Sequence, residues 1–335
     1  MRALAANLPT ALREGFASGL DLAPPALRSS QIVAVGMGGS GIAADLARGV
    51  IEAETPAMVS VVRSPELPRG TDRRSHVILV SYSGNTWETL RAFDAAGRVG
   101  AHRTVITSGG ELAELAHERG VPVLPVPAGL PPRSAVGHLL GGFLGLLDPW
   151  FPESNEARVA RVMERVRTLI GSLVRAGGPA AKLATRLDDR LPFIYAESSF
   201  LALARRWKTQ IEENAKRLAV FDEVPELFHN AIVGWDATSR TEARRAVAVL
   251  LEWSEEAAMT RRSLRYLERL LLGHGARVVR VPLDAEDRLE ALVGGVAFGD
   301  HVSLFLADRR RVDPLPVDAI GRLKAALGSS ARSDD

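Results

Sequence analysis

VAVGMGGSG, residues 33–41, joins a short apolar run to a glycine-rich turn, and IAADLARGV follows with the pattern of a helix. A buried strand that leads through glycines into a helix is the opening unit of a parallel α/β fold. The glycines at 36, 38 and 41 also satisfy G-x-G-x-x-G, the pattern of dinucleotide-binding turns. The turn therefore has two interpretations: it holds the pyrophosphate of a dinucleotide, or the single phosphate of a sugar.

Composition restricts the class of protein. The chain has 335 residues, enough for one large domain or two of ordinary size, and its 46% apolar and 24% charged residues are typical of a soluble globular protein. The net charge is only +2 and no basic block is interleaved with aromatic residues, so nucleic acid is not a favoured partner. The absence of cysteine excludes disulfides, thiol nucleophiles and cysteine-based zinc sites, and fits a cytoplasmic protein.

The sequence does not predict a membrane protein. Residues 1–7 lack the basic start and apolar stretch of a signal peptide. The longest apolar run noted, residues 135–147, contains a histidine and is too short for a membrane span, so a buried helix is expected there.

Strand-like and helix-like segments alternate along the first half of the chain. Strands are expected at 31–35, 58–62, 76–81, 104–107 and 122–126, and helices at 40–51, 86–97 and 134–147. Continuous apolar strands in this rhythm predict a parallel sheet that is covered on both faces.

The rhythm restarts after a looser stretch at 176–192. A helix is expected before that stretch, at 155–175. After it, strands are expected at 193–196, 246–251 and 277–281, and helices at 199–216, 263–272 and 316–327. We therefore predict an α/β protein of two doubly wound parallel-sheet domains, residues 1–152 and 153–328, followed by a disordered tail at 329–335. Ligands of such folds bind beyond the carboxyl ends of the strands, which directs attention to the loops after residues 35, 81 and 196.

The loop after the third expected strand reads SYSGNTWETL, residues 81–90. Ser81, Ser83 and Thr86 supply hydroxyl groups, Gly84 permits a sharp turn, and Thr86 suits the N-cap of the next helix. Hydroxyls, free backbone N–H groups and a helix N-terminus together form an anion cradle that needs no basic side chain. A plain helix-capping turn is the alternative, but the loop's place at the end of a central strand favours the cradle.

The two loops together decide between the interpretations of the glycine turn. A dinucleotide site also needs an acidic residue at the end of the next strand, where this chain has Arg63. Arginine would accept a 2′-phosphate, so an NADP-dependent oxidoreductase stays an alternative, although it leaves the serine loop without a role. A sugar phosphate uses both loops, with Gly38, Gly39 and Ser40 near the sugar and the second loop on its phosphate.

GMGGSG and SYSGNT resemble the sugar isomerase (SIS) domain. Four further blocks are similar, in the same order, to the bifunctional phosphoglucose/phosphomannose isomerase family: PPRSAVGHLLG at 131–141, RRWKTQIEENAK at 205–216, VPELFHNAIVGW at 224–235 and DPLPVDAIGRLKAAL at 313–327. The resemblance implies two SIS domains, usually in a homodimer, with the site at domain and subunit interfaces. It implies interconversion of glucose 6-phosphate and fructose 6-phosphate, often also of mannose 6-phosphate, without metal or organic cofactor.

The same resemblance implies roles for single residues. Glu213 matches the base that carries a proton between C2 and C1, His229 the histidine that opens the sugar ring, Lys324 an active-site lysine and Arg133 an arginine near the reacting carbons. The substrate and phosphate contacts match Gly38, Gly39, Ser40, Ser81, Ser83 and Thr86.

These residue types suit the chemistry. A carboxylate can accept and return one proton from one position, and histidine titrates near neutral pH. A fixed Arg133 would stabilise an enediolate, as an oxyanion site does. Lys324 is one of only four lysines in an arginine-rich chain: Lys182, Lys208, Lys216 and Lys324.

Three positions depart from the family pattern. Trp87 and Ala231 stand where acidic residues are usual, and Leu315 stands in DPLP where threonine is frequent. Leucine adds bulk without a hydroxyl near C1 and C2, which puts the mannose 6-phosphate activity in doubt. A non-catalytic SIS protein that senses a sugar phosphate is the alternative, although a sensor needs neither Glu213 nor His229.

Overall fold

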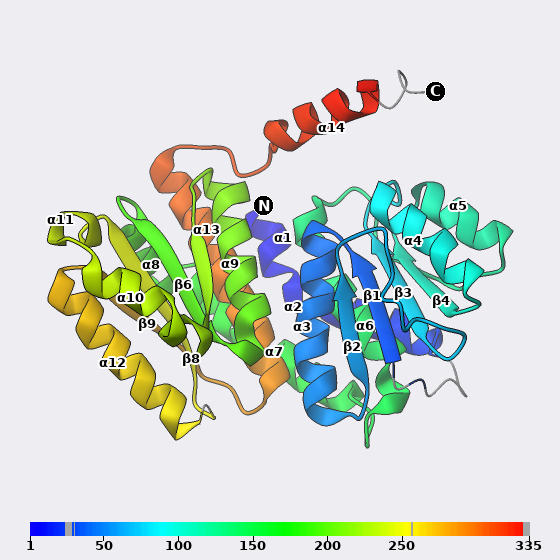
Figure 1. Ribbon diagram of the computed structural model, residues 1–335, viewed down its shortest axis with the longest axis horizontal. Helices are drawn as coiled ribbons and strands as arrows, with labels where there is room; N and C mark the ends of the chain where they lie inside the picture. The colour runs from blue at the N-terminus through cyan, green and yellow to red at the C-terminus, as the bar shows by residue number, and fades with distance from the viewer. Residues whose placement is uncertain (24–28, 30, 256, 331–335) are drawn as a thin grey trace.

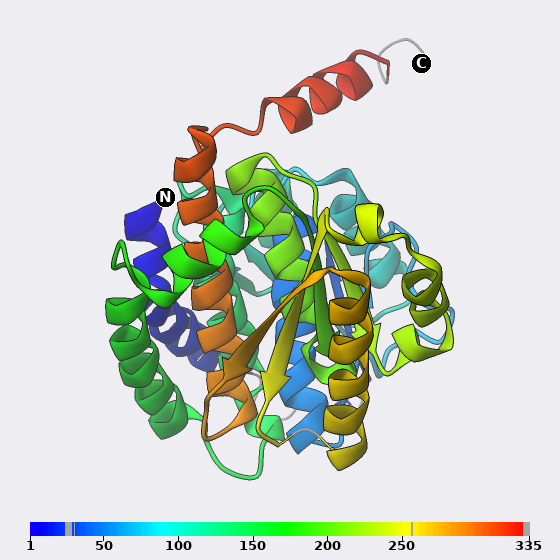
Figure 2. The ribbon, with the colours of Figure 1, turned by 90° about the vertical axis from the view of Figure 1, so that its left-hand side faces the viewer.

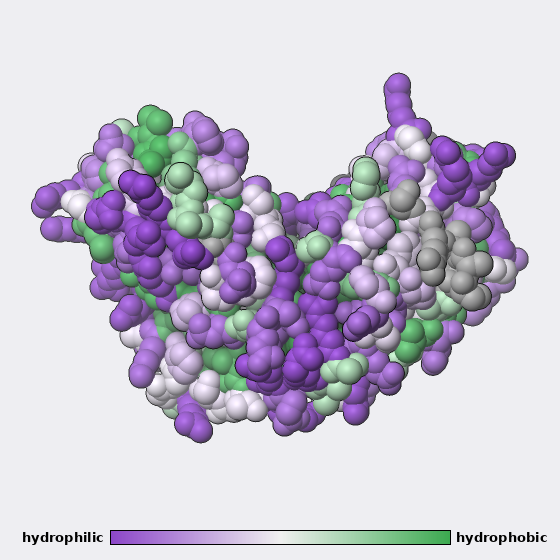
Figure 3. All heavy atoms as spheres, turned by 90° about the horizontal axis from the view of Figure 1, so that it is seen from below, coloured by the Kyte–Doolittle hydropathy of each residue, from purple (hydrophilic) through white to green (hydrophobic). Residues whose placement is uncertain are grey.

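The computed structural model describes residues 1–23, 29, 31–255 and 257–330, with only the backbone at 324, 325 and 327–330. Two parallel sheets lie in the two halves of the molecule, with helices between them and on their outer faces (Figure 1). The predicted α/β fold with parallel sheets is therefore confirmed. Seen from below, the surface is largely hydrophilic and a notch separates the two lobes (Figure 3).

The first sheet contains all five expected strands in the order β2-β1-β3-β4-β5, and every neighbouring pair is parallel. The strands are β1 (Gln31–Gly36), β2 (Met58–Val62), β3 (His76–Ser81), β4 (His102–Thr107) and β5 (Val123–Pro125). Alternate residues of β1 enter two cores. Ile32 and Ala34 face the central core, and Val33 and Val35 face an outer core under α4 (Trp87–Arg98) and α5 (Gly110–Glu118).

The second sheet has the order β7-β6-β8-β9, also parallel. Its strands are β6 (Leu191–Glu197), β7 (Val220–Val224), β8 (Ala246–Trp253) and β9 (Arg277–Leu283). The edge strand β7 was not expected from the sequence, because VFDEV carries two acidic residues and is only partly buried. The outer face of this second sheet is covered by α10 (Ala231–Ala237), α11 (Arg240–Ala243) and α12 (Ala258–His274). Helix α12 begins five residues before the helix expected at 263–272.

The prediction of a looser stretch at 176–192 is wrong, because these residues include helix α8 (Pro179–Leu187). Proline at the first helical position is favourable, and Ala180, Leu183, Ala184 and Leu187 form one buried face. The sequence interpretation also gave no helix at 288–310, where α13 (Arg288–Arg310) runs through the central core. Helix α13 is apolar and long enough to cross a membrane by composition, but nearly all of its most apolar window is buried inside the protein.

Close glycine contacts join α2 (Leu8–Asp21) to α6 (Val136–Leu146) at the base of the first half. A Cβ added at Gly141 would lie 2.1 Å from the Leu12 carbonyl oxygen, and one at Gly145 would lie 2.0 Å from that of Phe16. The backbones of the two helices can approach this closely only because both positions lack a side chain. The buried helix expected at 134–147 is thus confirmed, with its first turn formed by the 3-10 segment η1 (Pro132–Ala135).

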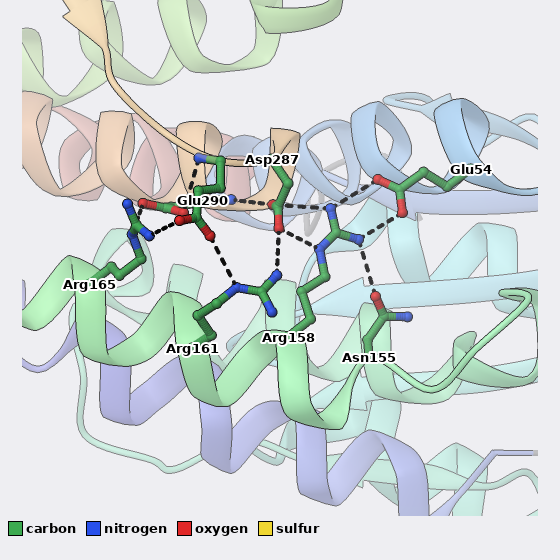
Figure 4. Close-up of polar contacts among 8 residues, drawn as sticks. Glu54, Asn155, Arg158, Arg161, Arg165, Asp287 and Glu290 are labelled. Carbon is green, nitrogen blue, oxygen red and sulfur yellow. Dashed lines mark hydrogen bonds and ion pairs between the residues drawn. The ribbon is translucent and has the colours of Figure 1, made fainter.

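An ion-pair network holds the two halves together at the end of α3 (Gly38–Glu54), far from the glycine turn. Arg158 of α7 (Glu156–Leu173) bonds Glu54 of the first half through both Nη atoms, at 2.7 and 2.9 Å. The same guanidinium donates to both oxygens of Asp287, the N-cap of α13, at 3.1 Å (Figure 4). Arg158 therefore bridges a carboxylate from each half.

Helix α14 (Asp318–Ser330) confirms the expected terminal helix and stands away from the body in both ribbon views (Figures 1 and 2). The disordered tail expected at 329–335 is wrong at 329–330, where α14 continues, and its remainder, 331–335, lies outside the described residues. Helix α9 (Leu201–Ala215) ends at the same upper edge, below the segment that leads to α14 (Figure 1).

Candidate active site

The glycine turn lies at the carboxyl edge of the first sheet, where β1 ends and α3 begins. Gly38 has a φ of +50° and is exposed, while Ser40 is buried in the first turn of α3. A Cβ at Gly41 would lie 2.4 Å from the Gly36 carbonyl oxygen, so the turn closes tightly on itself. No acidic residue occupies the first turn of α3, which leaves the helix N-terminus suited to an anion.

The serine loop lies beside this turn, because β3 pairs with β1. The Ser81 hydroxyl is 2.8 Å from the Thr86 hydroxyl and accepts a hydrogen bond from the Gly84 N–H at 3.1 Å. Thr86 occupies the N-cap position of α4 as expected, but its side chain faces Ser81 and does not cap the helix. Ser83 is exposed, and its hydroxyl accepts a hydrogen bond from the Asn85 N–H at 3.3 Å.

Arg133 connects the first half to the second. Its side chain is only 4% exposed, and its Nε donates to the Asn214 side-chain oxygen at 2.9 Å. Nη1 lies 3.4 Å from Glu213 Oε2, and Nη2 donates to the carbonyls of Pro314 and Leu315 at 2.5 and 3.1 Å. The loop of Arg133 also borders the glycine turn, since its Cα is 3.5 Å from the position of a Cβ on Gly39.

Buried polar contacts fix Arg133 from behind. Asn214 donates to the Ser303 hydroxyl at 2.9 Å, and Arg206 donates to the Arg133 carbonyl at 3.2 Å and to Asp300 Oδ2 at 2.7 Å. Asn214, Arg206 and Asp300 were not singled out from the sequence. The RRWKTQIEENAK block, which contains two of them, was the available signal.

Glu213 lies near the end of α9 with its side chain 31% exposed. Burial raises the pKa of its carboxyl above the ordinary value, and the positive charge of Arg133 is the largest effect in the opposite direction. A carboxylate made more basic by burial and held beside a fixed guanidinium suits proton abstraction next to developing negative charge. Glu213 also lines a cavity of about 510 Å³ between α9 and the first turn of α14.

His229 does not reach Glu213 within one chain. Helix α9 runs against the strands, and Glu213 lies about 18 Å along it from Leu201 at 1.5 Å per residue. His229 ends the 3-10 segment η4 (Glu226–His229), after the carboxyl end of β7, where the Val224 carbonyl bonds Ser198 near the start of α9. His229 is exposed and lies at the opposite end of α9 from Glu213.

The remaining expected residues have mixed outcomes. Lys324 lies on α14, but its side chain is outside the described part of the chain. Arg63, which a dinucleotide would need for a 2′-phosphate, instead pairs with Asp45 and donates to the Gly41 carbonyl at 3.2 Å. No group of three or more His, Asp or Glu suited to a metal ion occurs within the residues that the structure describes.

The chain is similar in sequence to known phosphoglucose isomerases. A family model described as the bacterial phospho-glucose isomerase C-terminal SIS domain matches residues 177–327. The chain is 33% identical to a bifunctional phosphoglucose/phosphomannose isomerase of Caldicellulosiruptor bescii, over 92% of this chain and 93% of the relative. It is also 33% identical to the enzyme of that name from Aquifex aeolicus, over 84% and 86% of the two chains.

A solved structure resembles the fold. The C-terminal domain of glucosamine-fructose-6-phosphate aminotransferase from Francisella tularensis superposes with a TM-score of 0.72 at 16% identity, covering 92% of this chain and 96% of that one. At that identity, the match supports the arrangement of helices and strands alone.

Proposed function

The chain belongs to the bifunctional phosphoglucose/phosphomannose isomerase family, and on that premise we propose that it interconverts glucose 6-phosphate and fructose 6-phosphate. The observation that carries the proposal is Glu213, a carboxylate of raised pKa that lies 3.4 Å from a buried arginine. Both groups lie at the sheet edge where the glycine turn and the serine loop provide an anion cradle. Mannose 6-phosphate is the weaker substrate in this proposal, because Leu315, whose backbone carbonyl accepts from Arg133, has a side chain without a hydroxyl.

In the proposed reaction Ser81, Ser83 and Thr86 bind the phosphate, and Gly38, Gly39 and Ser40, the N-terminus of α3, lie against the sugar. Glu213 takes the proton from C2 of the open-chain aldose and returns it to C1 of the cis-enediol, which gives the ketose. The Arg133 guanidinium stabilises the negative charge on the enediolate oxygen. Lys324 donates to a sugar hydroxyl or to the ring oxygen.

Ring opening assigns a role to a second subunit. His229 lies at the far end of α9 from its own Glu213, so we propose a homodimer in which each active site receives His229 of the partner subunit. The cavity of about 510 Å³ beside Glu213 provides space for an entering loop. We propose the domain boundary at residues 152 and 153, between η2 (Asp148–Trp150) and α7, and a cytoplasmic location.

The first test is turnover of fructose 6-phosphate by the purified chain, coupled to glucose-6-phosphate dehydrogenase without added metal. Turnover supports the isomerase. Saturable binding of fructose 6-phosphate in calorimetry without turnover would contradict it and support a sugar-phosphate sensor. A fluorescence change on mixing with NADPH would favour the oxidoreductase alternative.

A mixing experiment tests the partner histidine. Glu213→Gln and His229→Gln variants, each inactive alone, are unfolded and refolded together in equal amounts. Half of the dimers are then mixed, and each mixed dimer has one complete site, so we expect about a quarter of wild-type activity. If the histidine came from the same chain as the glutamate, no activity would return.

A further inference from the structure

Lys216 is a lysine that the proposed chemistry leaves without a role. It follows the last residue of α9, three positions after Glu213, and has a φ of +54°. Among the described residues, Lys216 and Arg311 are the two non-glycine residues in the left-handed region, which is unfavourable for a residue with a Cβ. They are the C-caps of α9 and α13; the segment that follows α13 is bonded to Lys216 at the end of α9.

That segment, residues 312–317, is called the strap here and leads from α13 to α14. The Lys216 ammonium donates to the Pro316 carbonyl at 2.7 Å and to the carbonyl of Glu213. Arg133 donates to the two preceding carbonyls of the strap, those of Pro314 and Leu315. Two cations thus hold three successive strap carbonyls, and both cations also contact Glu213.

The closeness of these cations has a cost that the strap offsets. Burial and, after it, the charge of Arg133 lower the pKa of Lys216. The strap carbonyls of Pro314, Leu315 and Pro316 accept hydrogen bonds from the two cations and so stabilise both charges where they lie close together. The arrangement therefore specifies the position of the strap relative to the end of α9.

We propose that Lys216 is a positioning residue for the isomerisation, an inference that rests on the proposed function. Its ammonium joins the helix end that carries Glu213 to the strap, and the strap fixes both the guanidinium of Arg133 and the start of α14. Loss of the ammonium would remove the direct bond between the end of α9 and the strap, and would leave the phosphate cradle, on the other half, intact. The effect should therefore fall on kcat and spare KM.

The test compares three substitutions at Lys216 with one control. Lys216→Met removes the charge and keeps the aliphatic stem. Lys216→Gly removes the side chain and relaxes the left-handed backbone, so it separates the ammonium from strain. Lys216→Arg keeps a cation. Arg311→Gly relaxes the other left-handed residue, which has no side-chain bond to the strap, and is the matched control.

Turnover of fructose 6-phosphate and amide hydrogen exchange of residues 312–321 are measured for each variant. We expect Lys216→Met and Lys216→Gly to lower kcat at least about tenfold, because small misplacements of catalytic groups have large effects, and to change KM less than about threefold. Both should speed exchange in the strap. Lys216→Arg should retain most of the activity, and Arg311→Gly should match the wild type.

Three results would overturn the positioning role: wild-type kcat in Lys216→Gly, a lower kcat with unchanged strap exchange, or faster strap exchange with unchanged kcat. The second of these would mean that the ammonium acts on Glu213 directly. If the wild type shows no turnover, the proposed function fails by itself. Strap exchange then still decides whether Lys216 anchors the strap, since it does not depend on activity.

Discussion

Replacement of Arg158 by methionine tests how the two halves are held together. All five N–H groups of the guanidinium lie near acceptors: both carboxylate oxygens of Glu54, both of Asp287, and the side-chain oxygen of Asn155 at 3.2 Å. Arg158 is 14% exposed, Glu54 33% and Asp287 22%, so the network is shielded but not dry. Methionine keeps the packing of the stem and leaves two carboxylates facing each other.

The structure sets the size of the effect. Removal of one partner of a fully buried ion pair costs about 3–5 kcal/mol, and partial exposure brings the expected loss in the free energy of unfolding to about 2–4 kcal/mol. With about 2 °C per kcal/mol for a chain of this length, the melting temperature should fall by about 4–8 °C. The ionised carboxyl of Asp287 also contributes to the stability of this network. Burial alone would raise the pKa of its carboxyl, but hydrogen bonds from Arg158 and the Glu290 N–H lower it overall.

Differential scanning calorimetry of four proteins measures this loss. Arg167→Met is the control on the same helix. Arg167 pairs with exposed Glu164 three residues earlier, so the change should shift the melting temperature by less than about 1 °C. The double variant Glu54→Gln, Arg158→Met should recover part of the loss, since it removes one uncompensated carboxylate. Equal melting temperatures for Arg158→Met and Arg167→Met would refute the bridge as a source of stability.

Three further predictions concern the site. Gly84→Ala should lower the free energy of unfolding by about 2 kcal/mol or more in urea titrations, because the new Cβ would lie 1.8 Å from the Gly109 carbonyl oxygen. Gly100→Ala has the same φ of +70° but its Cβ would meet nothing nearer than the Arg73 Cβ at 3.9 Å, so it should lose clearly less. The acid limb of the kcat/KM profile should lie above the ordinary glutamate pKa, because burial raises the pKa of Glu213 and activity needs its ionised form. Activity is therefore lost as the pH falls through the raised pKa, and an acid limb at or below the ordinary pKa would contradict the assignment. Leu315→Thr should raise the ratio of mannose 6-phosphate to fructose 6-phosphate turnover by about tenfold. The melting temperature should change little because Leu315 is 51% exposed, and an unchanged ratio would show that Leu315 does not affect the choice of substrate.

The sequence predicted those elements whose apolar residues have a clear period. All five strands of the first sheet and the glycine and serine loops were foreseen, since β1 and β3 are continuous apolar runs that end in loops of distinctive composition. Strand β7 was missed because it is an edge strand that is only partly buried, and Asp222 and Glu223 interrupt the apolar pattern expected of a strand. Helix α13 was missed for the opposite reason: it is buried nearly all round, so no amphipathic period marks it.

The site divides in the same way. Residue types and motifs selected Glu213 and Arg133, which do lie together, 3.4 Å apart. The sequence carried no information on which contacts cross between the halves, so the bonds of Asn214 to Arg133 and of Lys216 to the strap emerged only from the fold. The separation of His229 from Glu213 likewise depends on the direction of α9 relative to β7, which a motif does not specify.

The most direct test of the proposed base is the kcat of Glu213→Gln beside that of Glu212→Gln. The two residues are neighbours on α9, but Glu212 pairs with Lys208 at 2.7 Å and does not contact Arg133, so it controls for charge and for helix stability. We predict that Glu213→Gln lowers kcat for fructose 6-phosphate by at least about 100-fold at an unchanged or higher melting temperature, because the buried ionised carboxylate is itself unfavourable. Glu212→Gln should stay within about threefold of the wild type. Equal activity in the two variants, or loss only in Glu212→Gln, would contradict the assignment of Glu213 as the base.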